Sequence, residues 1–246
     1  MNPLIKIIKG YNQDCLFTDS INESNYIEQV NQIVDNLKKS HTNLKKSYTN
    51  FIFCILDNYD IILSNTADNE KYHILNQKVI NILSEIENDT FHNQFNYNEK
   101  VMKRRLVQNG LQLSLKRSNM ISSIYYLNDL YKTHFVLVDA NKKEYYETTP
   151  KNYPKVYLTM NNKKYSLSDT CNTDFFVSSA LNSLTLFTID VKPTIYKTYL
   201  ESISKYKVGE LKDIATNLEI NLINQGKTKT KQVLYDEINL YNLNLI

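Results

Sequence analysis

The spacing of apolar residues changes near Gly110, and this change is the strongest constraint that the sequence places on the fold. Before it, apolar residues recur at the three- and four-residue intervals of amphipathic helices. This spacing predicts helices at 22–39 and 75–86, and a third helix over 97–107 that ends near Gly110. The first half of the chain is therefore expected to be mainly helical.

The segment between the first two predicted helices has a different character. Runs of β-favouring apolar residues flank Asp57 and Asn58, a pair of residue types that is common in turns. We therefore expect a β-hairpin at 51–63.

After Gly110 the pattern is typical of strands. The segment LQLSLK alternates apolar and polar residues, and later runs are rich in Tyr, Val and Thr. These runs predict an antiparallel sheet whose hairpin turns lie at 141–143 and 161–162. The apolar run 175–189 fits either a buried strand or a buried helix, and Pro193 closes the main domain. The expected class is α+β: N-terminal helices, an antiparallel sheet core and a small C-terminal two-helix module.

The chain has 246 residues, a mass of 28.9 kDa and 42% hydrophobic residues, a composition that excludes a disordered chain. It suits a core domain at 1–194 and a helical module at 195–246. The longest unbroken apolar run is 51–56, whereas a membrane-spanning helix needs about 20 residues. The amino-terminal segment also lacks the apolar core of a signal peptide. We expect an intracellular protein that does not bind membranes.

Glycine is scarce, with 4 scattered residues, so the Gly-rich phosphate-binding loops of the common nucleotide-binding folds are excluded. The three cysteines are far apart and the four histidines are dispersed, without the close pairing of zinc ligands. The sequence therefore indicates no metal, no cofactor and no disulfide framework, and it favours a reducing compartment.

The last forty residues carry the most specific pattern, YKVGELKDIATNLEINLINQGKTKTKQVLYDEINLYNL. One face of a first helix would carry Val208, Leu211, Ala215 and Leu218. The stretch 221–226 then breaks the helical pattern, and Thr228 or Thr230 can cap a second helix. The second helix is expected to bury three residues against the first: Val233, Leu234 and Ile238.

The order Val-x-Glu-Leu-Lys-x-Ile-Ala, then Leu-x-Ile, then Gly-Lys-x-Lys before Leu and Ile resembles the SAP family and its helix-extended-loop-helix relatives, including the N-terminal module of Rho termination factors. The resemblance covers roughly residues 204–242. It implies a small apolar core of Val208, Leu211, Ile214, Leu218, Ile220, Leu234 and Ile238. It implies a DNA-contacting corner of Gly226, Lys227, Lys229 and Lys231. The implied partner is DNA, bound mainly through phosphates with little reading of sequence.

Physical chemistry supports the same partner, because lysines before a helix N-terminus supply cations and free backbone N–H groups for a phosphate. Lys207 and Lys212 on the first helix are further candidate contacts. Against this, 195–246 contains seven lysines and six acidic residues, a net charge of only one. Docking to another protein and a purely structural cap on the core are therefore the alternatives.

A second basic segment lies at 97–118, where three arginines and three lysines oppose only Glu99. Arginine suits phosphate recognition, and Tyr97 is an aromatic neighbour that could stack on a base. The arginines are Arg104, Arg105 and Arg117. We take them as candidate nucleic-acid contacts, with a solvated helix face as the alternative.

His134 opens an apolar strand-like run that is followed by a turn, Glu147 and, later, Cys171. This order resembles the His-strand-turn-strand-carboxylate segment of the SUMO-protease and adenovirus-protease clan. The resemblance implies a protease in which His134 activates the Cys171 thiol and Glu147 orients the imidazole. A histidine satisfied at a strand edge is the alternative. Cys15 lies in a segment that resembles one of the ovarian-tumour-type proteases, with His134 as its partner, and Cys54 is expected to be a buried apolar residue.

These patterns favour a non-enzymatic adaptor whose C-terminal module attaches it to DNA or to a DNA-associated assembly. The composition, without a familiar catalytic core, resembles that of uncharacterised proteins of large AT-rich DNA viruses, which implies a virion or a viral replication compartment. The alternatives are the cysteine protease and a minor capsid or scaffold protein that binds only proteins. The oligomeric state is not indicated.

Overall fold

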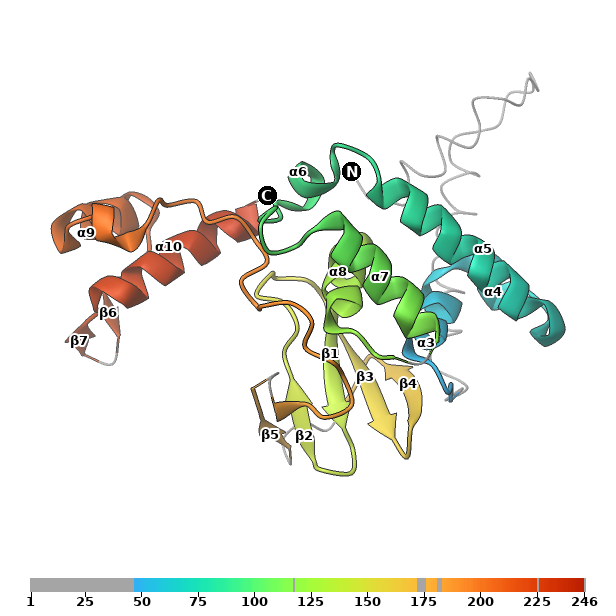
Figure 1. Ribbon diagram of the computed structural model, residues 1–246. Helices are drawn as coiled ribbons and strands as arrows, with labels where there is room; N and C mark the ends of the chain where they lie inside the picture. Colours follow the sequence, from blue (N-terminus) through green and yellow to red (C-terminus); the bar gives the residue numbers. More distant parts are fainter. Residues whose placement is uncertain (1–46, 117, 172–175, 181–182, 225, 246) are drawn as a thin grey trace, which may run out of the picture. The chain divides into compact units, whose positions relative to one another are not determined.

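The computed structural model describes residues 47–116, 118–171, 176–180, 183–224 and 226–245 (Figure 1). Helices come first, a sheet follows and helices close the chain, so the α+β class is confirmed. Among the described helices, none is long and apolar enough to cross a membrane. The helix predicted at 22–39 lies outside the described residues.

The helices that precede the sheet share one apolar core with it. Their bounds are α3 (Phe51–Tyr59), α4 (Ile61–Asn65), α5 (Asp68–Ile86), α6 (Phe91–Phe95), α7 (Arg104–Leu115) and α8 (Ile121–Tyr131). The predicted helix at 75–86 is confirmed as the second half of α5. α7 packs against α3, α5 and α8, and α3 also packs against the sheet.

The hairpin predicted at 51–63 is wrong, because this segment forms α3 and α4. The side chain of Asn50 caps α3 by accepting a hydrogen bond from the backbone N–H of Ile52 at 2.8 Å. Asp60 caps α4 in the same way, through the N–H of Leu63 at 3.0 Å. α3 is buried almost all round, and a short helix of this kind has the same continuous apolar pattern as a buried strand.

The helix predicted over 97–107 is also displaced, because α7 begins at Arg104 and continues through Gly110. The alternating LQLSLK segment is therefore the end of this helix and not a strand. A side chain at Gly110 would bring its Cβ within 2.4 Å of the Ser122 hydroxyl oxygen on α8. Gly110 thus allows α7 and α8 to approach closely, whereas the sequence pattern suggested that it ends a helix.

The five-stranded sheet has the order β4-β3-β1-β2-β5. Its strands are β1 (His134–Asp139), β2 (Glu144–Tyr146), β3 (Lys155–Asn161), β4 (Lys164–Ser168) and β5 (Val177–Ser178). The hairpins β1–β2 and β3–β4 are antiparallel, with the first turn where the sequence predicts it and the second turn one residue later, at 162–163. The expectation of an antiparallel sheet is nevertheless wrong as a whole, because β1 pairs with β3, and β2 with β5, in parallel.

The parallel pair arises because the chain from β2 to β3 passes around the start of β1. The Thr148 hydroxyl donates to the carbonyl of Phe135 at 2.8 Å, and the N–H of His134 donates to the carbonyl of Pro154 at 2.8 Å. β1 is buried along its whole length and lies between β2 and β3, as its continuous apolar sequence requires. The alternation of apolar and polar residues within a strand does not predict this order of the strands in the sheet.

The run 175–189 contributes only the short β5 to the sheet in its described part. The rest is irregular, but Leu184 and Phe187 are buried in the main core. Ile195 and Tyr196 also belong to this core, so the first residues of the predicted module are packed on the core domain.

A buried carboxylate, Asp129 near the end of α8, holds this region together. Its side chain is 0% exposed and pairs with the Lys151 ammonium at 2.9 Å. The hydroxyls of Tyr153 and Tyr196 donate to Asp129 at 3.0 and 2.9 Å. The Lys151 ammonium also lies 4.5 Å from the centre of the Tyr196 ring, and this ring stacks on the buried Tyr97. We call Asp129, Lys151, Tyr153 and Tyr196 the Asp129 cluster.

We expect Asp129→Asn to destabilise the protein by about 3–5 kcal/mol, because it leaves the Lys151 ammonium buried without its counter-charge. The matched control is Glu99→Gln, which removes an exposed carboxylate 3.5 Å from Lys197 and should cost less than about 1 kcal/mol. Denaturant unfolding at pH 7 measures both free energies. Equal losses for the two variants would contradict the assignment of Asp129 as the anchor.

Candidate nucleic-acid interface

The C-terminal module, residues 195–246, has two helices at the positions that the sequence predicts: α9 (Val208–Asn217) and α10 (Lys231–Leu245). A short 3-10 turn, η3 (Ile203–Lys205), precedes them. The helices bury a small apolar core that is separate from the main one and consists of Leu200, Leu211, Ala215, Leu234 and Ile238.

Two residues expected in this core lie outside it. Val208 is 42% exposed and Val233 is 38% exposed. Val208 is the first residue of α9, and Val233 is turned about 100° around α10 from Leu234, which faces α9. Of the other residues that the SAP resemblance implies, Ile214, Leu218 and Ile220 pack at the edge of the core.

The connection between α9 and α10 contains a hairpin rather than an extended loop. Its strands are β6 (Ile223–Asn224) and β7 (Lys227–Thr228), paired antiparallel. Gly226 has φ of +76°, a left-handed conformation that glycine adopts without strain, so the turn explains this residue. Lys229 then donates its backbone N–H to the carbonyl of Leu222 at 2.9 Å.

Lys229, one of the predicted phosphate contacts, lies in an ion pair. Its ammonium is 2.6 Å from a carboxylate oxygen of Glu237 on α10, and its side chain is only 10% exposed. Lys229 therefore fastens the hairpin to α10 and does not present a free cation to solvent.

Lys227 and Lys231 differ from Lys229 in their ion pairing. Lys227 is exposed on β7, Lys231 is the first residue of α10, and neither forms an ion pair with any described residue. The Thr230 side chain caps α10 by accepting from the N–H of Val233 at 3.4 Å. Among the described groups, the N–H groups of Lys231 and Gln232 have no acceptor, as is normal at a helix start. The hairpin and the start of α10 thus place two cations beside free N–H donors.

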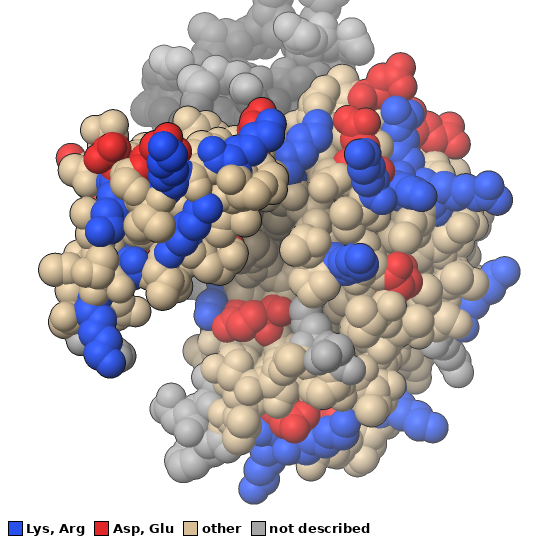
Figure 2. Space-filling model, turned by 60° about the vertical axis from the view of Figure 1, so that its left-hand side comes forward, with Lys and Arg blue, Asp and Glu red and all other residues tan. Residues whose placement is uncertain are grey.

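Lys207 and Lys212 lie on α9, Lys207 at its N-cap and Lys212 in its first half. Within the described chain neither forms an ion pair, although the backbone N–H of Lys207 donates to Glu210 at 2.7 Å. Figure 2 turns the side that carries α9 and α10 in Figure 1 toward the viewer, and there lysines are interspersed with acidic side chains. The candidate interface is therefore local to the hairpin and helix start, and no continuous basic surface surrounds it.

The structure separates the basic residues of 97–118. Arg104 and Arg105 begin α7 and Lys116 follows its end, about 18 Å away along the helix. Arg104 is engaged locally, donating to the carbonyl of Glu87 at 2.9 Å and to Asp89 at 3.1 Å. Tyr97 is fully buried, so its ring cannot stack on a base.

Arg105 remains exposed, and Arg117 lies outside the described residues. The basic segment of the sequence is therefore not one patch in the part of the chain that is described. Contact of its arginines with nucleic acid stays a prediction, and Arg104 already forms an ion pair with Asp89 within the fold.

Of the three protease candidates, the structure brings two together. The Nε2 atom of His134 is 2.8 Å from a carboxylate oxygen of Glu147 and 3.2 Å from the backbone nitrogen of Thr148. His134 is 4% exposed at the start of β1, and Glu147 also pairs with Lys155 at 2.9 Å. Cys171 follows β4, two strands away from β1, and burial raises the pKa of its thiol.

That direction of pKa shift is opposite to the one that an imidazole-activated thiolate shows. Burial also raises the pKa of the Cys54 thiol, within α3, while Cys15 lies outside the described residues. His134 therefore binds the segment that passes around the start of β1. Of the three-residue arrangement that the protease hypothesis requires, the described residues contain the contact between His134 and Glu147.

Burial lowers the pKa of His134, assisted by Lys155 and opposed by Glu147. In the unfolded chain the imidazole titrates near pH 6.5, so on acidification the unfolded state takes up the proton first. The contribution of His134 to stability is therefore complete above about pH 6.5 and declines as the pH falls below it. We expect unfolding free energies measured from pH 8 to pH 5 to fall less steeply in His134→Gln than in wild type. His73→Gln, at an exposed site, should keep the wild-type slope.

Cysteine reactivity tests the protease hypothesis directly. Because its pKa is raised, Cys171 should react with iodoacetamide at pH 7.5 more slowly than a cysteine in a short unstructured peptide. Peptide mapping by mass spectrometry measures the rate, and His134→Gln should leave it unchanged. A fast reaction at Cys171 that disappears in His134→Gln would instead support a protease.

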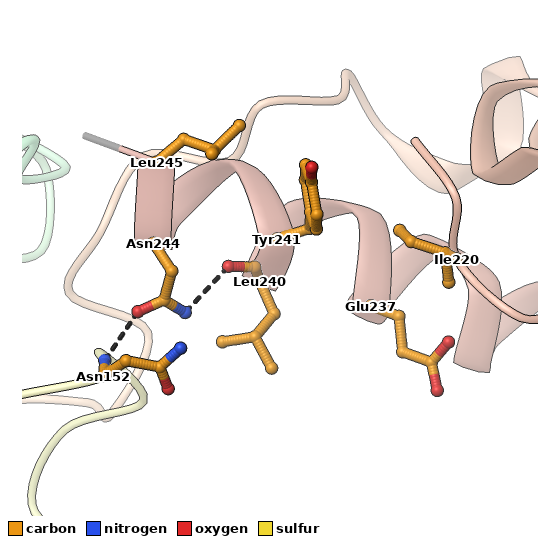
Figure 3. A pocket seen from close by; sticks show the side chains of 7 residues that line it. All are labelled: Asn152, Ile220, Glu237, Leu240, Tyr241, Asn244 and Leu245. Atoms are coloured by element: carbon orange, nitrogen blue, oxygen red, sulfur yellow. Dashed lines mark hydrogen bonds between the residues drawn. The ribbon is translucent and has the colours of Figure 1, made fainter. Parts of the chain in front are cut away.

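The module contacts the core domain near the end of α10. The side-chain oxygen of Asn244 accepts the backbone N–H of Asn152 at 2.6 Å, and Leu243 joins the main core. An open pocket of about 430 Å³ lies beside this contact, between α10, Ile220 and Asn152 (Figure 3). Its apolar lining includes Leu240 and Tyr241, which are 42% and 41% exposed.

No known protein family, curated protein or solved structure matches this chain. In the described residues, no group of three or more His, Cys, Asp and Glu side chains could hold a metal ion. The candidate site therefore depends on the geometry of the module alone.

The sequence identified the start of α10, but it predicted an extended loop in place of the β6–β7 hairpin and did not show which lysines form ion pairs. Lys229 precedes α10, so the helical spacing that could signal an ion pair with Glu237 does not apply to it. The Asp129 cluster had no such signal, because its members come from three distant segments.

Proposed function

We propose that the C-terminal module binds duplex DNA through its phosphates, with little preference for sequence, and that the core domain is the cargo or adaptor. The observation that carries this proposal is the hairpin and helix start, where Lys227 and Lys231 are free of ion pairs with described residues and flank free backbone N–H groups. Such an arrangement suits a phosphate, because lysine ammonium groups and the free N–H groups of a helix start both attract anions.

The small net charge of the module indicates weak binding. Lys229 is neutralised by Glu237, and Lys205 by Glu201 at 2.5 Å, so these two lysines add little to the attraction. Lys207 and Lys212 would add contacts only where the duplex also reaches α9. Binding of this kind comes from counterion release and falls steeply as salt is raised.

The test is the double variant K227Q/K231Q in the full chain. Fluorescence anisotropy with random-sequence duplexes, repeated over a range of salt concentrations, gives the slope of log affinity against log salt. We expect the affinity to fall about equally for all duplexes, and the slope to decrease by about two, one for each phosphate contact removed.

K132Q/K192Q is the matched control, since Lys132 and Lys192 are exposed lysines of the core domain and the same charge is removed. It should keep the wild-type slope. Equal behaviour of the two double variants would overturn the assignment to the module. A wild-type chain that binds no DNA, but self-associates in light scattering, would favour the alternative of a scaffold that docks through the pocket beside α10.

A further inference from the structure

The parallel pairing of β1 and β3 places two lysine-rich turns at one edge of the sheet. Both strands end at the same edge, with Asp139 opposite Met160, and both hairpin turns follow directly. The turn after β1 carries Lys142 and Lys143, and the turn after β3 carries Lys163 and Lys164 at the start of β4. The turn pair lies at the lower end of the sheet in Figure 1. We call these four residues the turn lysines.

The two turns are close neighbours. The hairpins occupy adjacent pairs of strands in the order β4-β3-β1-β2, so their midlines are two strand spacings, about 10 Å, apart. All four turn lysines are exposed, and none forms an ion pair with a described residue. One of them, Lys142, donates to the hydroxyl of Thr185 at 3.1 Å.

The acidic residues beside the turns are engaged within the fold. Asp139 is 2% exposed and accepts the backbone N–H groups of Asn141 and Lys142, at 3.0 and 3.1 Å. Glu144 accepts the hydroxyl of Tyr146. The lower end of Figure 2, at the height of the turns in Figure 1, shows lysine side chains that project from this edge and acidic side-chain atoms beside them.

The backbone supplies a second, independent observation. Lys143 and Lys163 have φ of 55° and 62°, in the left-handed region that glycine or asparagine adopts more readily. The turn between β3 and β4 has two residues, Asn162 and Lys163, both with positive φ, and such turns favour glycine at the second position. Lysine at these two positions is therefore not explained by the stability of the turns.

We propose that the turn lysines form a second nucleic-acid contact on the core domain, separate from the module. Four cations on two tips about 10 Å apart suit the repeated phosphates of a duplex better than a single small anion. The side-chain amides of Asn141 and Asn162, at the same tips, add donors for phosphate or sugar oxygens. The apolar residue in these turns, Ala140, is too small to anchor them in a lipid bilayer, so a nucleic acid is favoured over a membrane surface.

The experiment compares single variants in the full chain. K163Q removes one turn lysine, and K132Q removes an exposed lysine that also has positive φ, 48°, and precedes β1 at the opposite edge of the sheet. With random-sequence duplex DNA, K163Q should decrease the salt slope of binding by about one, and K132Q should leave it unchanged. The quadruple variant K142Q/K143Q/K163Q/K164Q should weaken binding about tenfold or more at low salt, while its thermal unfolding stays cooperative.

The outcomes separate this inference from the proposed function of the module. Loss of affinity in the quadruple variant alone, with K227Q/K231Q unchanged, supports the turn lysines and overturns the module assignment. The reverse result overturns the turn lysines. Binding of wild type to vesicles containing phosphatidylserine, but not to duplex DNA, would overturn both and assign the turns to a membrane surface.

Discussion

The burial of Asp129 is the interaction on which most of the architecture depends. A carboxylate removed from water is tolerated only when its oxygens are bonded and its charge is balanced. Lys151, Tyr153 and Tyr196 satisfy both requirements, and each comes from a segment that has no regular structure of its own. One side chain of α8 thus fixes two segments: the segment that precedes β3, and the segment in which the chain leaves the core domain.

The same segment links the core domain to the module. Lys151 binds Asp129, and the next residue, Asn152, donates its backbone N–H to Asn244 near the end of α10. Tyr196 binds Asp129 from the other direction along the chain, just before the module begins. These two polar attachments of the module therefore lead to the same buried carboxylate, and the burial of Leu243 in the main core adds to them.

The connection from β2 to β3 determines which side chains meet at the surface. Because it passes around the amino end of β1, β3 runs parallel to β1, and the two hairpin turns emerge together. An antiparallel meander of the same four strands would also place these two turns at one edge, but it would put β2, and not β1, beside β3. The connection therefore sets which strands are neighbours, β1 beside β3, and the buried contacts of Thr148 with His134 and Phe135 hold it in place.

Sequence reasoning succeeded where a pattern is local. The helices α9 and α10, the cap at Thr230 and the turn at 141–143 follow from residue spacing and turn chemistry. The second turn lies one residue beyond its predicted place, and Val208 and Val233 are exposed at the ends of the predicted apolar faces. Sequence reasoning failed where tertiary contacts determine the secondary structure. α3 has the continuous apolar sequence of a buried strand because other elements surround it. The strand order and the ion pair of Lys229 depend on tertiary contacts, so a count of lysines overstated the cations that the candidate site offers.

The contact between Gly110 and Ser122 has a consequence for how the sequence can vary. Asn, Lys and Tyr are abundant throughout this chain, and exposed positions can exchange among such residues at little cost. Gly110 cannot, because even a methyl group would press against the Ser122 hydroxyl on a helix that is buried along most of its length. We therefore expect Gly110 to be retained by selection in any relative that keeps α7 against α8, however far the surface of the protein diverges.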